Sequence, residues 1–183
     1  MVRKPIEEWS DATQWKCKLT ILIKPDFDSF DDVKDSLKDI DAFICCLGTR
    51  TKTGEANFVK VDYQYPLNFA EFAKANNVKH YSLLTSGGAD ANSSFLYMRV
   101  KGQVEEAVAK VGVPSLAIYN PGLIKGRKGN DTRVGETVLG WIPFIPSIQS
   151  ADLGLAILTN AIATSQREQA SSDEPSKVSY TMN

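Results

Sequence analysis

The sequence predicts an α/β protein built around a doubly wound parallel sheet. Short apolar runs alternate along the chain with longer segments of helical periodicity, and turn-forming residues follow each apolar run. Strands and crossover helices that build a parallel sheet come in this order. The chain has 183 residues, of which 43% are hydrophobic, so one domain spanning 1–183 can bury a sizeable core.

Four apolar runs are the expected strands, and they cover residues 19–23, 42–47, 81–85 and 115–119. Right-handed crossovers place the carboxyl ends of parallel strands along one edge of the sheet. Turn residues follow three of these strands, and we expect them to line one crevice; they are residues 48–49, 86–87 and 120–122. In an open doubly wound sheet, such a crevice is where a nucleotide binds.

Helical patterns fill the segments between the strands. The first helix is expected at 30–37, with Asp28 or Ser29 as its cap. The second is expected at 63–75, with Pro66 near its first turn. There the missing N–H of the proline costs little, whereas further inside it would break the helix.

Two more helices and a polar tail complete the predicted organisation. The third helix runs to about residue 110 and ends at Gly112, and the fourth covers 151–163. Residues 165–176 are polar and are expected to form a flexible loop before a last strand at 177–180.

Composition and charge exclude several classes of protein. The formal net charge is -1 and the isoelectric point about 5.9, which does not favour nucleic acid or an anionic membrane as a partner. No apolar run approaches the roughly 20 residues that a membrane-spanning helix needs. The three cysteines form no spaced disulfide framework, and residues 1–8 carry neither a secretory signal nor the acidic-poor bias of a transit peptide. We therefore expect a cytoplasmic location.

Tyr97 and Lys101 are the candidate catalytic pair. Residues four apart lie on the same face of a helix, so the Lys101 ammonium can reach the region of the Tyr97 hydroxyl. A nearby positive charge stabilises a phenolate and lowers the pKa of a tyrosine from about 10 toward the working pH. Ser86, at the carboxyl end of an expected strand, would then hold a carbonyl oxygen while Tyr97 delivers a proton. The spacing alone also fits a half-buried aromatic residue beside a solvated lysine.

The other chemistry-bearing residues point to no metal site. Cys45 and Cys46 are adjacent, so they point to opposite faces of a strand and make a poor metal pair. His80, the one histidine of the chain, precedes an expected strand and is expected at the surface. It has no partners for a catalytic triad, which argues against serine hydrolase chemistry.

Several motifs occur in the order and spacing of a known family. They are FICCLGT at 43–49, the helix and strand segments at 58–74 and 78–86, FLYMRVKG within 92–105, and NPG at 120–122. These segments resemble the atypical branch of the short-chain dehydrogenase/reductase superfamily that is related to the Tat-interacting oxidoreductase. The resemblance covers nearly the whole chain and is tightest over 41–122.

The resemblance implies a Rossmann-like fold and an NADP-dependent oxidoreductase acting on a carbonyl or alcohol substrate. It implies that Ser86 orients the substrate carbonyl, that Tyr97 is the acid/base, and that Lys101 binds the nicotinamide ribose and tunes Tyr97. It implies a substrate side at 123–150, and Asn120 stands where a relative often has Arg. The further cofactor contacts that it implies are Arg3 and Lys4 at the extra phosphate, Asp26 and Phe27 beside the adenine, and Leu47, Gly48, Thr49, Pro121 and Gly122 in the turns.

The chain departs from this family at the pyrophosphate site. The family opens with a strand, a G-x-x-G-x-x-G turn and a helix whose backbone N–H groups hold the pyrophosphate, and none of the 12 glycines here forms that motif. Residues 1–4 instead match the end of the family's second strand, so we expect a sheet without its first strand and an N-terminally truncated chain. Two interpretations stay open: a fragment of a normal reductase, or a complete regulatory chain that binds a partner without turnover.

Overall fold

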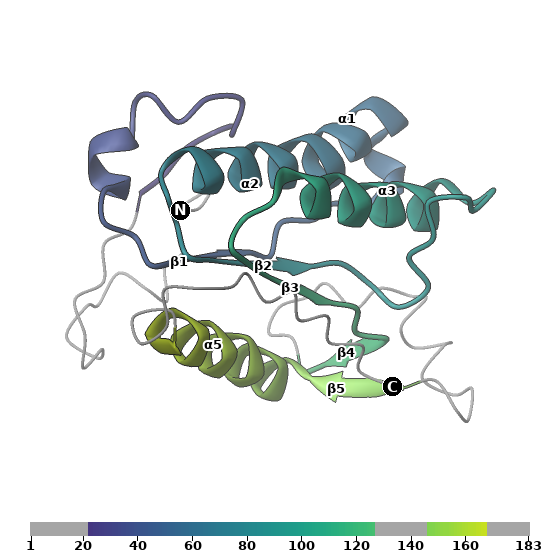
Figure 1. Ribbon diagram of the computed structural model, residues 1–183. Helices are drawn as coiled ribbons and strands as arrows, with labels where there is room; N and C mark the ends of the chain where they lie inside the picture. The colour runs from purple at the N-terminus through teal and green to yellow at the C-terminus, as the bar shows by residue number, and fades with distance from the viewer. Residues whose placement is uncertain (1–21, 127–145, 168–183) are drawn as a thin grey trace. The chain divides into compact units, whose positions relative to one another are not determined.

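The computed structural model describes residues 22–126 and 146–167 (Figure 1). The chain divides into two compact units, Met1–Lys38 and Asp39–Asn183. The described part of the first unit contains a 3₁₀ helix, η3 (Lys34–Leu37), and an ion pair between Lys24 Nζ and Asp32 Oδ1 at 2.6 Å. The single domain expected from the sequence stays a prediction.

The helix predicted at 30–37 is wrong over its first half, since only its last four residues are helical, as η3. The Ser29 hydroxyl accepts a hydrogen bond from the Asp31 N–H at 3.1 Å and donates one to the Asp31 carboxylate at 2.7 Å. Short polar side chains that bond to nearby backbone compete with a helix in this way. Of the strand predicted at 19–23, only residues 22 and 23 are described, and they belong to none of the strands of either sheet.

A parallel sheet forms the centre of the second unit. Its strands are β1 (Ala42–Cys45), β2 (His80–Leu84) and β3 (Ser115–Tyr119), in the order β1-β2-β3. Phe43 lies opposite Tyr81, which in turn lies opposite Leu116. The parallel α/β fold and these three strands are therefore confirmed, with boundaries shifted by at most two residues.

Helices cover both faces of this sheet (Figure 1). On one face lie α2 (Tyr65–Ala75) and α3 (Leu96–Val111), and on the other lies α5 (Ser150–Arg167). Phe43 packs against two rings of α2, with ring centroids 5.7 Å from Phe69 and 5.9 Å from Phe72. Leu153 and Ile157 of α5 form a core cluster with the strand residues Ala117 and Tyr119. The strands are thus buried between two helical layers, as continuous apolar runs require.

The helix before β2 is longer than predicted and contains a wide turn. It runs through α1 (Glu55–Val59), a π-helical segment η5 (Lys60–Gln64) and α2, so Pro66 lies well inside it. A proline ring clashes with the carbonyl four residues before it, and its nitrogen donates no hydrogen bond. The helix accommodates this by widening, and the Tyr65 N–H bonds to the carbonyl of Lys60 five residues back. Pro66 was expected in the first turn of the helix, but the helix begins at Glu55 and accommodates the proline with a π turn.

The remaining helices agree with the predictions, and one small sheet was missed. Gly112 ends α3 with a φ of 74°, and α5 extends to Arg167, into the loop expected from 165. A second parallel pair, β4 (Leu123–Lys125) and β5 (Ser147–Gln149), is too short for a sequence pattern to reveal. The strand predicted at 177–180 lies outside the described residues.

His80 is not at the surface, which corrects the prediction. Its ring is 1% exposed within β2, with Nδ1 2.9 Å from the Ser115 hydroxyl and Nε2 2.8 Å from the Ser82 hydroxyl. Burial lowers the pKa of His80 below its usual value. Two hydroxyl partners satisfy both ring nitrogens, so the imidazole is buried in its neutral form.

Candidate functional site

A cavity of about 360 Å³ opens at the carboxyl ends of β1 and β2. The turn after β1 lines it with Leu47, Gly48 and Thr49, and α3 lines it with Tyr97 and Lys101. The α5 helix closes the other side with Leu153, Gly154 and Ile157. The sheet edge that the topology predicted as a binding crevice therefore carries a real cavity.

Lys101 reaches this cavity as one half of a buried ion pair. Its Nζ lies 2.8 Å from Oδ1 of Asp62, and the two side chains are 6% and 1% exposed. The other carboxylate oxygen of Asp62, Oδ2, accepts a hydrogen bond from the Thr49 N–H at 2.8 Å. Asp62 Oδ1 has no hydrogen bond of good geometry, so its contact with Lys101 is mainly Coulombic. The low dielectric of a buried site strengthens such an attraction.

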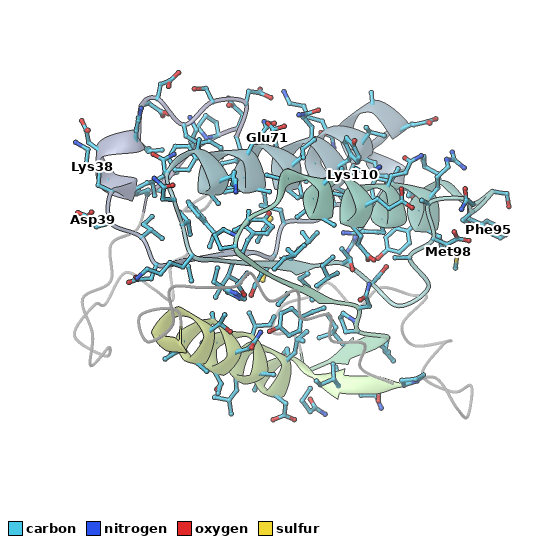
Figure 2. The ribbon with its side chains drawn as sticks, viewed as in Figure 1. Lys38, Asp39, Glu71, Phe95, Met98 and Lys110 are labelled. Atoms are coloured by element: carbon cyan, nitrogen blue, oxygen red, sulfur yellow. The ribbon has the colours of Figure 1, made fainter. Side chains whose placement is uncertain are left out.

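Tyr97 lines the same cavity from one helical turn before Lys101. Its half-buried ring stacks on Phe58 of α1, with centroids 5.8 Å apart and planes at 28°. The phenol is thereby supported from one side by an aromatic partner. Phe95 and Met98, from the same end of α3, instead project outward into solvent (Figure 2).

Ser86 does not line the cavity, although the residue before it does. The Ser86 hydroxyl oxygen is buried and has no hydrogen-bond partner among the described residues. Thr85 is the hydroxyl residue of this strand end that lines the cavity. Of the predicted catalytic residues, the structure thus brings Tyr97 and Lys101 together around one cavity and leaves Ser86 outside it.

The Thr85 hydroxyl belongs to a small polar network. It donates to Glu105 Oε1 at 2.6 Å, with the Tyr119 carbonyl also within reach at 3.2 Å. The Asn120 amide donates to the same Glu105 oxygen at 2.6 Å and to Thr85 Oγ1 at 2.9 Å. Desolvation raises the pKa of Glu105, and the hydrogen bonds from Thr85 and Asn120 partly oppose this. Asn120 therefore serves as a hydrogen-bond donor to a carboxylate.

The third strand end lies beside the second. The Gly87 N–H donates to the carbonyl of Pro121 at 2.7 Å, and a side chain at Gly87 would meet Gly122 at 3.4 Å. Pro121 and Gly122 therefore contact the turn after β2 and do not line the cavity.

The structure does not test the other predicted cofactor contacts. Asp26 and Phe27 belong to the first unit, where Asp26 Oδ1 accepts a hydrogen bond from the Asp28 N–H at 3.2 Å. Arg3 and Lys4 lie outside the described residues. Their roles at the cofactor stay predictions.

Sequence reasoning missed Asp62, Thr85 and Glu105 as parts of the site. The signal for Asp62 was present, because a carboxylate follows Val61 in a helix that otherwise turns apolar residues inward. A charged side chain in such a position is buried only when it is paired. Across the described ranges, no group of His, Cys, Asp and Glu side chains could hold a metal ion. Within the same ranges no helix is long and apolar enough to cross a bilayer.

Two proteins illustrate which sequences the chain is similar to. It is 45% identical over 112 residues to Protein HTATIP2 of Rattus norvegicus, an alignment that covers 61% of this chain and 46% of that protein. It is 34% identical over 113 residues to Protein FMP52, mitochondrial, of Meyerozyma guilliermondii, covering 61% of this chain and 49% of that protein. The chain thus spans about half the length of these curated relatives.

The names of the relatives correct one prediction. Several FMP52 proteins of yeasts and moulds are named as mitochondrial, which contradicts the cytoplasmic location expected from the sequence. The expectation relied on cysteine usage and on the composition of residues 1–8, and neither property specifies one compartment.

Solved structures show the fold class. MoeE5 in complex with UDP-glucose and NAD superposes with a TM-score of 0.67 at 10% identity, covering 88% of this chain and 62% of that chain. A UDP-N-acetylglucosamine 4-epimerase from Bacillus cereus superposes with a TM-score of 0.56 at 13% identity, covering 81% and 58%. The Rossmann-like fold is therefore confirmed. The HIM1 family model matches residues 13–139, more than half of the chain, and the protein belongs to the HIM1 family.

Proposed function

We propose that the chain provides the active-site part of a short-chain-type oxidoreductase that reduces a carbonyl with a nicotinamide dinucleotide, NADPH in preference to NADH. The observation that carries the proposal is that Tyr97 and Lys101 both line the cavity at the carboxyl ends of β1 and β2. The cavity volume of about 360 Å³ falls within the range of about 300–1,000 Å³ that is typical of small-molecule sites.

The residues around the cavity fit such a cofactor. Gly48 brings backbone without a side chain to the cavity wall, and Lys101 supplies a donor suited to ribose hydroxyls. Leu84, Ile124 and Ile157 add apolar surface suited to a flat ring. The similar fold of MoeE5, whose complex contains NAD, supports a dinucleotide at this edge of the sheet. When bound, the nicotinamide supplies the hydride.

The side chains of this chain then have distinct tasks. The Tyr97 hydroxyl donates a proton to the substrate oxygen, and Lys101 holds the ribose beside it. The family resemblance gives Ser86 the task of orienting the carbonyl, whereas Thr85 is the hydroxyl residue that lines the cavity. The preference for NADP depends on Arg3 and Lys4.

Substitution of Tyr97 by Phe tests the proposal. Because the change removes the proton donor and keeps the ring on Phe58, turnover of a carbonyl panel should fall about 100-fold or more while the NADPH dissociation constant changes less than about threefold. Turnover is measured as NADPH consumption, and binding as NADPH fluorescence. Tyr63→Phe is the matched control, because Tyr63 does not line this cavity. Full turnover by Tyr97→Phe would remove Tyr97 from the reaction.

A second candidate function is a regulatory protein that binds a nucleotide or a partner without turnover. One observation favours it: the Thr85 hydroxyl, which lines the cavity, is engaged by Glu105. This candidate predicts NADPH binding with no consumption of NADPH across the carbonyl panel. Measurable turnover that is lost in Tyr97→Phe would exclude it.

A further inference from the structure

We propose that Asp62 is a positioning residue, whose carboxylate holds Lys101 and the Gly48-Thr49 turn in one arrangement and so preforms the cavity for a hydroxyl-bearing ligand. The sequence motifs assign no role to Asp62. The ligand part of this inference rests on the proposed function, because it takes the ribose of a nicotinamide dinucleotide as the hydroxyl-bearing group. The positioning part depends only on the contacts of Asp62.

The position of Asp62 follows from the π turn. Asp62 lies in the middle of η5, and it is the residue whose carbonyl a regular helix would place against the ring of Pro66. The Tyr81 hydroxyl donates to the Pro66 carbonyl at 2.8 Å, so the turn is anchored to β2. Widened turns of this kind redirect side chains and recur at functional sites. Here the redirected side chain points at the cavity wall.

One carboxylate connects three segments of the chain. It belongs to η5, it pairs with Lys101 of α3 through Oδ1, and it accepts from the Thr49 N–H after β1 through Oδ2. A side chain at Gly48 would lie 3.5 Å from Oδ1 and 4.0 Å from Lys101 Nζ, so the turn packs directly against the pair. A movement of any one segment therefore disturbs the other two.

Burial makes this pairing obligatory for Lys101. An ammonium that is 6% exposed has lost nearly all of its water, and an unpaired charge in that position is strongly unfavourable. Because the carboxylate neutralises the ammonium, the pair offers hydrogen-bonding groups without net charge. Such a site suits the hydroxyls of a sugar better than a phosphate, which a free cation would attract.

A double-mutant cycle tests the coupling. The variants are Asp62→Asn, Lys101→Met and the combination, with Asp41→Asn, Lys79→Met and their combination as the matched control. The control pair has its atoms 3.0 Å apart, but its side chains are 58% and 35% exposed. We expect Asp62→Asn to lower the urea midpoint of unfolding by about 1 M or more, and the combination to recover much of this loss. The control variants should shift the midpoint by less than about 0.3 M.

Two further measurements separate positioning from stability alone. The ¹⁵N-¹H signal of the Thr49 amide should move in Lys101→Met, because that N–H donates to Asp62, the ion-pair partner of Lys101. The NADPH dissociation constant should rise about tenfold in Asp62→Asn and stay unchanged in Asp41→Asn. Adding Asp62→Asn to Lys101→Met should weaken binding no further. If Asp62→Asn alone does not fold, folding of the combination still shows the coupling as a rescue, and Lys101→Met still gives the amide shift.

Additive urea midpoints, or a Thr49 amide signal unchanged in Lys101→Met, would overturn the positioning role. NADPH binding by Asp62→Asn equal to that of the unmodified chain would overturn the link to the ligand. If the unmodified chain binds no NADPH, the proposed function fails for this chain, while the urea and amide measurements still decide the role of Asp62.

Discussion

The environment of an individual side chain in this protein depends on the partners that folding brings to it, and His80 shows the consequence. Its two nitrogens lie between the hydroxyls of Ser115 and Ser82, and burial lowers its pKa. The folded state therefore binds fewer protons at this ring than the unfolded chain does. Since stability rises with pH wherever the unfolded state binds more protons, the His80 contribution is complete above about pH 6.5 and is lost as the pH falls below it.

Substitution of His80 by Gln should reduce this acid sensitivity. We expect the urea midpoint of the unmodified chain to fall more between about pH 7.5 and about pH 5.5 than that of His80→Gln. Glu105 acts in the opposite direction, because its raised pKa makes the folded state bind more protons as the pH falls. Glu105 is present in both the unmodified chain and His80→Gln, so its contribution cancels when their pH dependences are compared. Equal pH dependence in both would mean that the histidine is not buried as a neutral group.

At the scale of elements, glycines inside helices have opposite roles at two places. A side chain at Gly102 of α3 would collide with the backbone of Asp90 and Ala91, whereas a side chain at Gly154 of α5 would meet nothing within 4 Å. The first glycine therefore allows the loop before α3 to approach the helix. The second lines the cavity but has no neighbour that a side chain would meet, and it lowers helix propensity.

The substitutions Gly102→Ala and Gly154→Ala should therefore change stability in opposite directions. We expect Gly102→Ala to lower the free energy of unfolding by about 2–3 kcal/mol, because backbone must move to relieve the overlap. Gly154→Ala should raise it by up to about 1 kcal/mol. Urea titrations of both variants measure these changes. A neutral Gly102→Ala would show that the loop at Asp90 is free to shift.

The elements themselves could be predicted to different degrees. The ranges of β2 and β3 followed from apolar runs, and the end of α3 followed from Gly112, because both signals are local. The start of the helix at Glu55 did not follow from the sequence, because Pro66 favoured a helix whose first turn lies near residue 66. Packing against β2 and α3 stabilises the π turn around this proline. The sequence pattern does not show which segments pack against one another.

At the scale of the whole molecule, strand ends and helices from both faces of the sheet build the cavity. The reactivity of two neighbouring cysteines can be used to probe whether the cavity is occupied. Cys46 is exposed and lines the cavity, whereas Cys45 is buried on the other side of the strand. Burial raises the pKa of Cys45 to about 11 and also raises that of Cys46. A thiol reacts through its thiolate, so both accessibility and pKa make Cys45 the slower group.

Alkylation with iodoacetamide should therefore modify Cys46 at least about tenfold faster than Cys45, and NADPH should slow the modification of Cys46. Peptide mass spectrometry measures both rates in one sample. Adenosine at the same concentration is the control, because it lacks the nicotinamide that the cavity is proposed to hold. Binding of NADPH without protection of Cys46 would place the cofactor outside this cavity.

The sequence by itself determined the parallel α/β sheet, the doubly wound arrangement and the common orientation of Tyr97 and Lys101. These properties depend on periods of two and 3.6 residues, which are local and can be read from the residues. Tertiary structure alone decided that Lys101 pairs with Asp62, that Thr85 and not Ser86 lines the cavity, and that His80 is buried. Each of these depends on which segments pack together, and a buried polar group is defined by the partner that packing brings to it.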